Sequence, residues 1–163
     1  MSMKIGYTTG VFDLFHIGHL NLLRNARALC DKLVVGVTTD DLVSYKHKRA
    51  VISFNERFEI VRACRYVDAV VPQDSLDKFI AWEKLRFDLM FVGDDWFKDD
   101  KWKMLDKKFS DVGVKIVYFP YTKGTSSTLL NEVLLRLRNA PVSAEESNFT
   151  AIANNQPVGH CAA

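Results

Sequence analysis

The chain has 163 residues, of which 48% are hydrophobic and 12% aromatic, a composition typical of one globular domain rather than a disordered chain. A formal net charge of +2 gives no support for a nucleic-acid partner, and no apolar run approaches the roughly 20 residues that a membrane helix needs. The three cysteines lack a paired spacing, which argues against a disulfide scaffold and suits a reducing cytoplasm.

Short apolar strands alternate with amphipathic helices along most of the chain. Strands are expected at residues 3–9, 32–38, 69–71, 89–92 and 114–119. Helices are expected at residues 18–30, 53 to about 65, 74 or 75 to about 85, 101–109 and 128–138. Ser53 with Glu56 forms a capping box, and Pro72 and Pro120 are expected to end strands. This alternation predicts an α/β fold, a doubly wound, Rossmann-like parallel sheet of five strands with helices on both faces.

Composition changes after residue 138. Residues 139–163 carry no apolar period, so we expect a flexible C-terminal tail after a folded domain of residues 1–138.

The most informative stretch is the turn between the first strand and the first helix. It contains His16-Ile17-Gly18-His19, which places two imidazoles on one helix face at the helix start. Helix N-termini attract phosphate, and glycine allows a ligand to approach the backbone closely. We therefore expect a nucleotide site whose phosphates lie between the two histidines. If the first and fourth strands are neighbours, the loop after residue 92 faces the same crevice.

Other polar residues have two interpretations each. Lys46 and Lys48 could contact substrate or be a solvated basic loop, and Asp13 could bind a metal or cap its own backbone. Arg57 and Arg65 would share one face of the second helix and either enter the site or pair with nearby acids. For Asp94, a ligand contact is the favoured interpretation. Residues 126–128 could form a helix cap and a phosphate site with the same amide groups.

The motif resembles that of the cytidylyltransferase-like nucleotidyltransferases, which carry His-x-Gly-His after the first strand. The likeness continues through Lys46-x-Lys48, Arg65-Tyr66-Val67-Asp68, Gly93-Asp94-Asp95-Trp96 and the run from Gly124 to Thr128, over residues 3 to 137. Within that superfamily the chain is most similar to the glycerol-3-phosphate cytidylyltransferase family.

The resemblance implies transfer of CMP from CTP to glycerol 3-phosphate, with Mg²⁺, by a cytoplasmic homodimer that neither binds nucleic acid nor inserts into a membrane. It implies catalytic roles for His16, His19, Lys46 and Arg65, and acceptor contacts for Lys46 and Lys78. The implied nucleotide contacts are Thr9, Gly10, Val11, Phe12, Asp13, His16, Gly18, His19, Lys48, Arg65, Asp94, Tyr121, Thr122, Lys123, Gly124, Thr125, Ser126, Ser127 and Thr128. Metal ligands are not implied.

One position departs from the family pattern. Tyr121 stands where the family has an arginine, and Lys123 follows two residues later as a replacement charge without the arginine fork. Two alternatives to the cytidylyltransferase interpretation therefore stay open: an adenylyltransferase of the same superfamily, and a nucleotide-binding module without catalysis.

Overall fold

The computed structural model describes residues 3–45, 49–93 and 100–139. The chain divides into two compact units, Met1–Asn131 and Glu132–Ala163. The elements follow the chain in this order: β1 (Ile5–Gly10), α1 (Ile17–Arg27), β2 (Lys32–Thr38), α2 (Asp40–Tyr45), α3 (Phe54–Arg62), β3 (Ala69–Gln73), α4 (Lys78–Leu85), β4 (Leu89–Gly93), α5 (Asp100–Asp111), β5 (Lys115–Phe119) and α6 (Ser127–Asn139).

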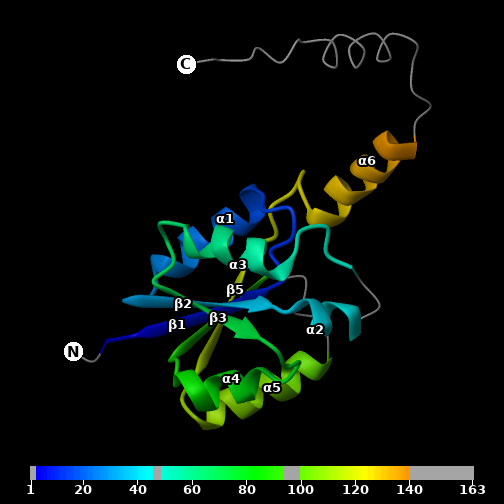
Figure 1. Cartoon of the computed structure of the whole chain (residues 1–163). Helices are drawn as coiled ribbons and strands as arrows, with labels where there is room; N and C mark the ends of the chain where they lie inside the picture. The colour runs from blue at the N-terminus through cyan, green and yellow to red at the C-terminus, as the bar shows by residue number, and fades with distance from the viewer. Residues whose placement is uncertain (1–2, 46–48, 94–99, 140–163) are drawn as a thin grey trace, which may run out of the picture. The chain divides into compact units, whose positions relative to one another are not determined.

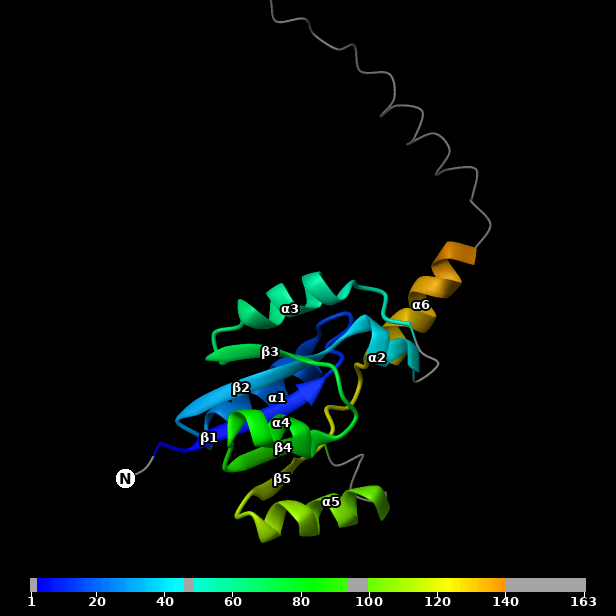
Figure 2. The same cartoon turned by 60° about the horizontal axis from the view of Figure 1, so that its bottom comes forward.

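The five strands form one all-parallel sheet, which confirms the predicted fold class. Their order is β3-β2-β1-β4-β5, which can be followed across the sheet in Figure 2. Because β1 lies between β2 and β4, the strand order reverses there, and ligands of such sheets bind beyond the strand ends at that point. The first and fourth strands are neighbours, which is the condition under which the loops that follow them face one crevice.

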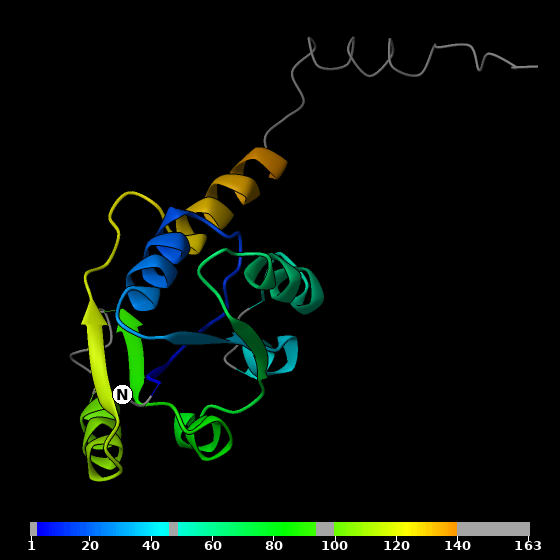
Figure 3. The same ribbon diagram turned by 90° about the vertical axis from the view of Figure 1, so that its left-hand side faces the viewer.

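Helices cover both faces of the sheet. Figures 1 and 3 show α1 and α3 on one face and α4 and α5 on the other. Successive β2 residues explain the two cores, since Leu33 and Val35 pack with α1 and α3 while Val34 packs on the opposite face with Phe109. Strands buried on both faces read as continuous apolar runs, which is why β2 was predicted with its observed bounds.

Several local expectations are corrected. Helix α2 was missed because its six residues show no apolar period, and α1 and α3 end three residues before their predicted ends. Pro72 lies inside β3, opposite Val37, rather than ending it; β3 is an edge strand, where a residue without an N–H is tolerated. The cap of α4 is Asp77, whose carboxylate accepts from the Phe79 amide, rather than Asp74 or Ser75.

The predicted tail falls almost wholly on residues 140–163, which lie outside the described residues, so that expectation stays a prediction. Among the helices that the structure describes, none combines the length and apolar content required to cross a bilayer.

Candidate functional site

The turn after β1 is held in an unusual backbone conformation. Phe12 and Leu14 have φ values of 56° and 47°, in the left-handed region that costs a non-glycine residue about 1 kcal/mol or more. Such a conformation persists only where neighbouring groups enforce it. The Arg57 guanidinium donates to the Val11 carbonyl, and this bond is one of the restraints.

Asp13 supplies the second restraint. Its carboxylate accepts from the amides of Val51 at 2.8 Å, Ile52 at 2.9 Å and Leu14 at 3.1 Å. Both carboxylate oxygens are therefore engaged with backbone, and Asp13 does not line the cavity described below. Of its two predicted alternatives, the backbone-capping interpretation fits the geometry, although the partners include a distant loop.

Arg57 is the centre of this scaffold. Its side chain is 0% exposed and donates from Nε to the Ile52 carbonyl at 2.9 Å and from Nη1 to the Thr38 carbonyl at 2.8 Å. Its Nη2 donates to the Asp40 carboxylate at 2.6 Å. Of its two interpretations, pairing with an acid is the correct one, and the acid is Asp40, on a different element.

The two motif histidines cap α1 together. His16 is the N-cap residue, and its Nδ1 accepts from the Gly18 amide at 3.0 Å. The Nδ1 atom of His19 accepts from the His16 amide at 3.4 Å, which completes a capping box made of imidazoles. Because an accepting nitrogen carries no proton, each neutral ring holds its proton on Nε2. The box therefore leaves two Nε2–H donors for a ligand.

The two rings lie against each other. Their centroids are 3.9 Å apart with planes inclined by 26°, so they are stacked at van der Waals contact. The expectation that phosphates lie between the two histidines is therefore wrong, since no space exists there. Both rings line the same cavity, and a phosphate would meet their edges rather than their faces.

Burial keeps both imidazoles neutral. It lowers the pKa of His19 to about 3, with a smaller contribution from the neighbouring His16, and it lowers the pKa of His16 below its usual value. The free edges are consequently neutral hydrogen-bond donors rather than cations at pH 7. Positive potential in this part of the site comes from the helix starts.

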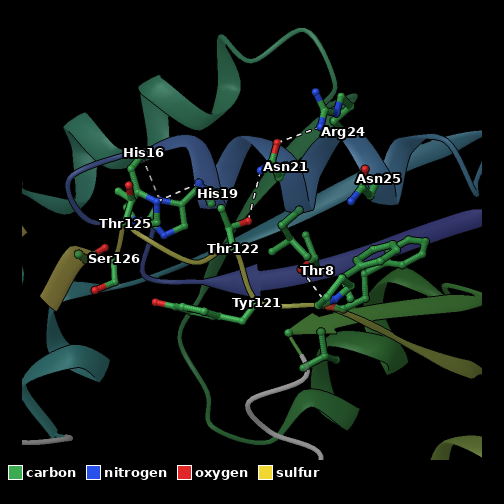
Figure 4. A pocket seen from close by; sticks show the side chains of 18 of the residues that line it. Thr8, His16, His19, Asn21, Arg24, Asn25, Tyr121, Thr122, Thr125 and Ser126 are labelled. Atoms are coloured by element: carbon green, nitrogen blue, oxygen red, sulfur yellow. Dashed lines mark hydrogen bonds between the residues drawn. The ribbon is translucent and has the colours of Figure 1, made fainter. Parts of the chain in front are cut away.

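A cavity of about 550 Å³ lies beyond the ends of β1, β4 and β5 (Figure 4). All of its lining residues belong to the first compact unit. They are Thr8, Thr9, His16, Gly18, His19, Asn21, Leu22, Arg24, Asn25, Phe91, Val92, Gly93, Phe119, Pro120, Tyr121, Thr122, Thr125, Ser126, Ser127 and Thr128.

The start of α6 forms the second helix N-terminus of this cavity. The Ser126 hydroxyl accepts from the Leu129 amide at 3.1 Å and caps the helix. The Ser127 hydroxyl donates to the Asp13 carbonyl at 2.6 Å, which ties this helix start to the histidine turn. The amides of Ser127 and Thr128 belong to the first helical turn, whose N–H groups lack intrahelical acceptors and suit phosphate oxygens.

The cavity gathers many of the residues predicted to contact nucleotide. These are Thr9, His16, Gly18, His19, Tyr121, Thr122, Thr125, Ser126, Ser127 and Thr128. Gly10, Val11, Phe12, Asp13, Lys123 and Gly124 do not line it. Lys46, Lys48 and Asp94 lie outside the described residues, so their assigned contacts stay predictions.

Arg65 and Lys78 are placed away from the cavity. Helix α3 ends at Arg62, so Arg65 does not share a helical face with Arg57, and its guanidinium lies over the Tyr66 ring at 5.3 Å. Lys78 begins α4, which lies on the face of the sheet opposite α1 (Figure 1). Its Nζ donates to the Leu76 carbonyl at 3.3 Å. Neither is a lining residue.

Sequence reasoning missed the wall formed by α1. Asn21, Arg24 and Asn25 all line the cavity, but as polar residues on an amphipathic helix they resemble its solvated face. Arg24 and Asn25 follow Asn21 by three and four residues, which places the three side chains on one helical face, and that spacing was the available signal.

A parallel sheet of order 3-2-1-4-5, with a cavity and two helix starts at its switch point, defines a nucleotide-binding protein of the nucleotidyltransferase class. The chain belongs to the cytidylyltransferase-like family, whose sequence profile matches residues 7–146.

Relatives with several substrates match most of the chain. The glycerol-3-phosphate cytidylyltransferase of Bacillus subtilis is 35% identical, over 83% of this chain and all of that protein. The ethanolamine-phosphate cytidylyltransferase of Arabidopsis thaliana is 34% identical, over 90% of this chain and 37% of that protein. The FAD synthase of Pyrococcus abyssi is 32% identical, over 78% of this chain and 88% of that protein.

Among solved structures, the lipopolysaccharide core biosynthesis protein of Thermoplasma volcanium is similar, with a TM-score of 0.64 and 26% identity. The match covers 76% of this chain and all of that one. The agreement extends the family assignment from sequence to fold.

Proposed function

We propose that this protein transfers CMP from CTP to glycerol 3-phosphate and releases pyrophosphate. The observation that carries the proposal is the imidazole capping box, whose two Nε2–H donors share one cavity with the first turn of α6. Two sets of donors on one cavity suit a triphosphate. The choice of CTP and glycerol 3-phosphate follows relatives that match over all or nearly all of their own length.

The chemistry is a direct displacement. An oxygen of the acceptor phosphate attacks the α-phosphorus of CTP, a new P–O bond forms, and the bond to pyrophosphate breaks on the opposite side. The nucleophile is already ionised, so no general base is required. The protein aligns two anions and stabilises the charge that develops on the α-phosphate and leaving group, through the His16 and His19 Nε2–H donors and the α6 amides.

Magnesium has no evident protein cage in the described residues. None of the lining residues of the cavity carries a carboxylate, and no group of three acidic, histidine or cysteine side chains that could hold a metal occurs within residues 3–45, 49–93 and 100–139. In this proposal the expected Mg²⁺ is carried by the triphosphate. The homodimer and the cytoplasmic location implied by the resemblance stay predictions.

Pyrophosphate release tests the proposal. CTP or ATP is supplied with glycerol 3-phosphate, phosphoethanolamine, FMN or no acceptor. We expect release with CTP and glycerol 3-phosphate together. Release with CTP and phosphoethanolamine alone would replace the acceptor, and release only with ATP and FMN would make the protein an adenylyltransferase. Tight CTP binding without release in any mixture would indicate a binding module.

The acceptor contact is tested with Lys46→Ala. If Lys46 binds the acceptor phosphate, the substitution raises KM for glycerol 3-phosphate with a smaller effect on KM for CTP. Lys108→Ala is the matched control, since Lys108 is an exposed lysine that pairs with Asp77 at 4.0 Å. An unchanged acceptor KM in Lys46→Ala would remove Lys46 from the site.

A further inference from the structure

The cavity extends along α1 beyond the groups that suit phosphate. Figure 4 shows His16, Thr125 and Ser126 at one end and Arg24 and Asn25 at the other. If the phosphates occupy the first end, as the proposed function requires, the nucleoside extends along α1 toward the second end. The base then lies beside the middle of the α1 wall.

The middle of that wall is a chain of hydrogen bonds. The Asn21 Nδ2 donates to the Thr122 hydroxyl oxygen at 3.3 Å, and the Arg24 guanidinium donates to the Asn21 Oδ1 at 3.0 Å. The first bond connects α1 to the segment after β5, the second lies within α1, and together they set the orientation of the Asn21 amide. Asn21 is half-buried between its partners, so its side chain is preorganised before a ligand binds.

The wall is richer in donors than in acceptors. The internal bonds occupy one acceptor site on Asn21 and one on Thr122. The remaining donors are the second Nδ2 hydrogen of Asn21, the hydroxyl hydrogen of Thr122 and most of the Arg24 N–H groups, against one acceptor site left on each of Asn21 and Thr122. A base edge that presents adjacent acceptors is complementary to this surface.

Cytosine has such an edge and uracil does not. N3 and O2 of cytosine are neighbouring acceptors, whereas N3 of uracil carries a hydrogen that would face the wall donors. Like polar groups facing each other disfavour the wrong ligand as strongly as good bonds favour the right one.

We infer that Asn21, held between Thr122 and Arg24, is a specificity-determining residue that reads the N3/O2 edge of cytosine and discriminates CTP from UTP. The inference rests on the proposed function. It assigns base selection to side chains of α1 that follow the two histidines along the helix.

Asn21→Asp tests the inference. The substitution keeps the shape of the side chain but replaces the Nδ2 donor with an acceptor. The Thr122 hydroxyl then donates to this acceptor. The wall therefore loses two donors for a ligand, the free Nδ2 hydrogen and the Thr122 hydroxyl hydrogen. We expect the ratio of kcat/KM for CTP to that for UTP to fall by about tenfold or more, the usual range for one base contact.

Asn25→Asp is the matched control. Asn25 lines the same cavity on the same helix but is outside the hydrogen-bonded chain, and the substitution adds the same negative charge. The CTP/UTP ratio of this variant should stay at the parent value, because both nucleotides carry the same triphosphate. Thr122→Val removes one donor without adding charge and is expected to lower the ratio by a smaller factor.

Three results would overturn the inference. One is a CTP/UTP ratio that stays within twofold of the parent value in Asn21→Asp and is also unchanged in Thr122→Val. Another is an equal fall in Asn25→Asp, which would make the effect one of charge alone. If the unmodified protein turns over ATP and not CTP, the proposed function fails together with the inference, whereas the first two results leave the proposed function intact.

Discussion

The protein contains two capping boxes built on the same backbone plan, at the starts of α1 and α3. In α3, Glu56 accepts from the Ser53 amide at 3.3 Å and from its hydroxyl at 2.6 Å. In α1, His19 and His16 take the corresponding positions. In the Ser53–Glu56 box, called the acid box below, the only side-chain donor is the Ser53 hydroxyl, and it is used within the box. The imidazole box keeps a second nitrogen on each ring, so the same local motif both starts a helix and presents two donors.

Removing a ring from the imidazole box gives the largest expected effect on turnover. His19→Ala should lower kcat by about 10²-fold or more, the usual result of losing one preorganised donor to a developing negative charge. His16→Ala should behave similarly. Single-turnover rates with CTP and glycerol 3-phosphate measure the effect, and an unchanged rate would remove the histidines from the phosphate site.

The imidazole box also makes stability depend on pH. The pKa of His19 is lowered in the folded state, so the unfolded state binds the extra proton, and stability falls as pH drops below about 6.5 toward 3. The slope for one such group is about 1.4 kcal/mol per pH unit. Urea unfolding at pH 7, 6 and 5 should show a shallower slope for His19→Asn than for the parent protein. Identical slopes would contradict the buried neutral imidazole.

Substituting the second helical residue of each box sharpens the comparison. A Cβ on Gly18 would lie 2.8 Å from Cε1 and 2.9 Å from Nδ1 of His16, closer than the ring can tolerate. Gly18→Ala should displace that ring and lower kcat roughly tenfold, equivalent to about 1.4 kcal/mol. The corresponding change in the acid box, Asn55→Ala, should leave kcat unchanged. Equal kcat values in both variants would show that the ring position is unimportant.

Disrupting the acid box should affect stability alone, and it is the smallest of these effects. Glu56→Ala is expected to lower the free energy of unfolding by about 1 kcal/mol, the usual value of a helix cap. Turnover per folded molecule should stay at the parent value. A loss of kcat at a temperature where the variant is fully folded would argue that α3 has a role in the site.

The contrast between the boxes also explains what the sequence could predict. Patterns in adjacent residues were sufficient for the Ser53–Glu56 box, for the bounds of β2 and for the presence of the His16–His19 pair. Contacts between distant segments could not be predicted from such patterns. Stacking of the two rings, the bonds from Asp13 to Val51 and Ile52, and the four acceptors of Arg57 all depend on how separate loops meet in space.

The α1 wall illustrates the same limit. Asn21 and Arg24 have the spacing of one helical face, but only the fold shows that Thr122, about a hundred residues later, lies against that face. A helix surface that borders a cavity and one that borders water have the same composition.

Nitrogen NMR of the histidine rings tests the central claim most directly. With resonances assigned from the His16→Asn and His19→Asn variants, both rings should be neutral at pH 7 with the proton on Nε2, and CTP should shift both Nε2 resonances. Rings protonated on both nitrogens, a proton on Nδ1, or no shift at saturating CTP would contradict the account.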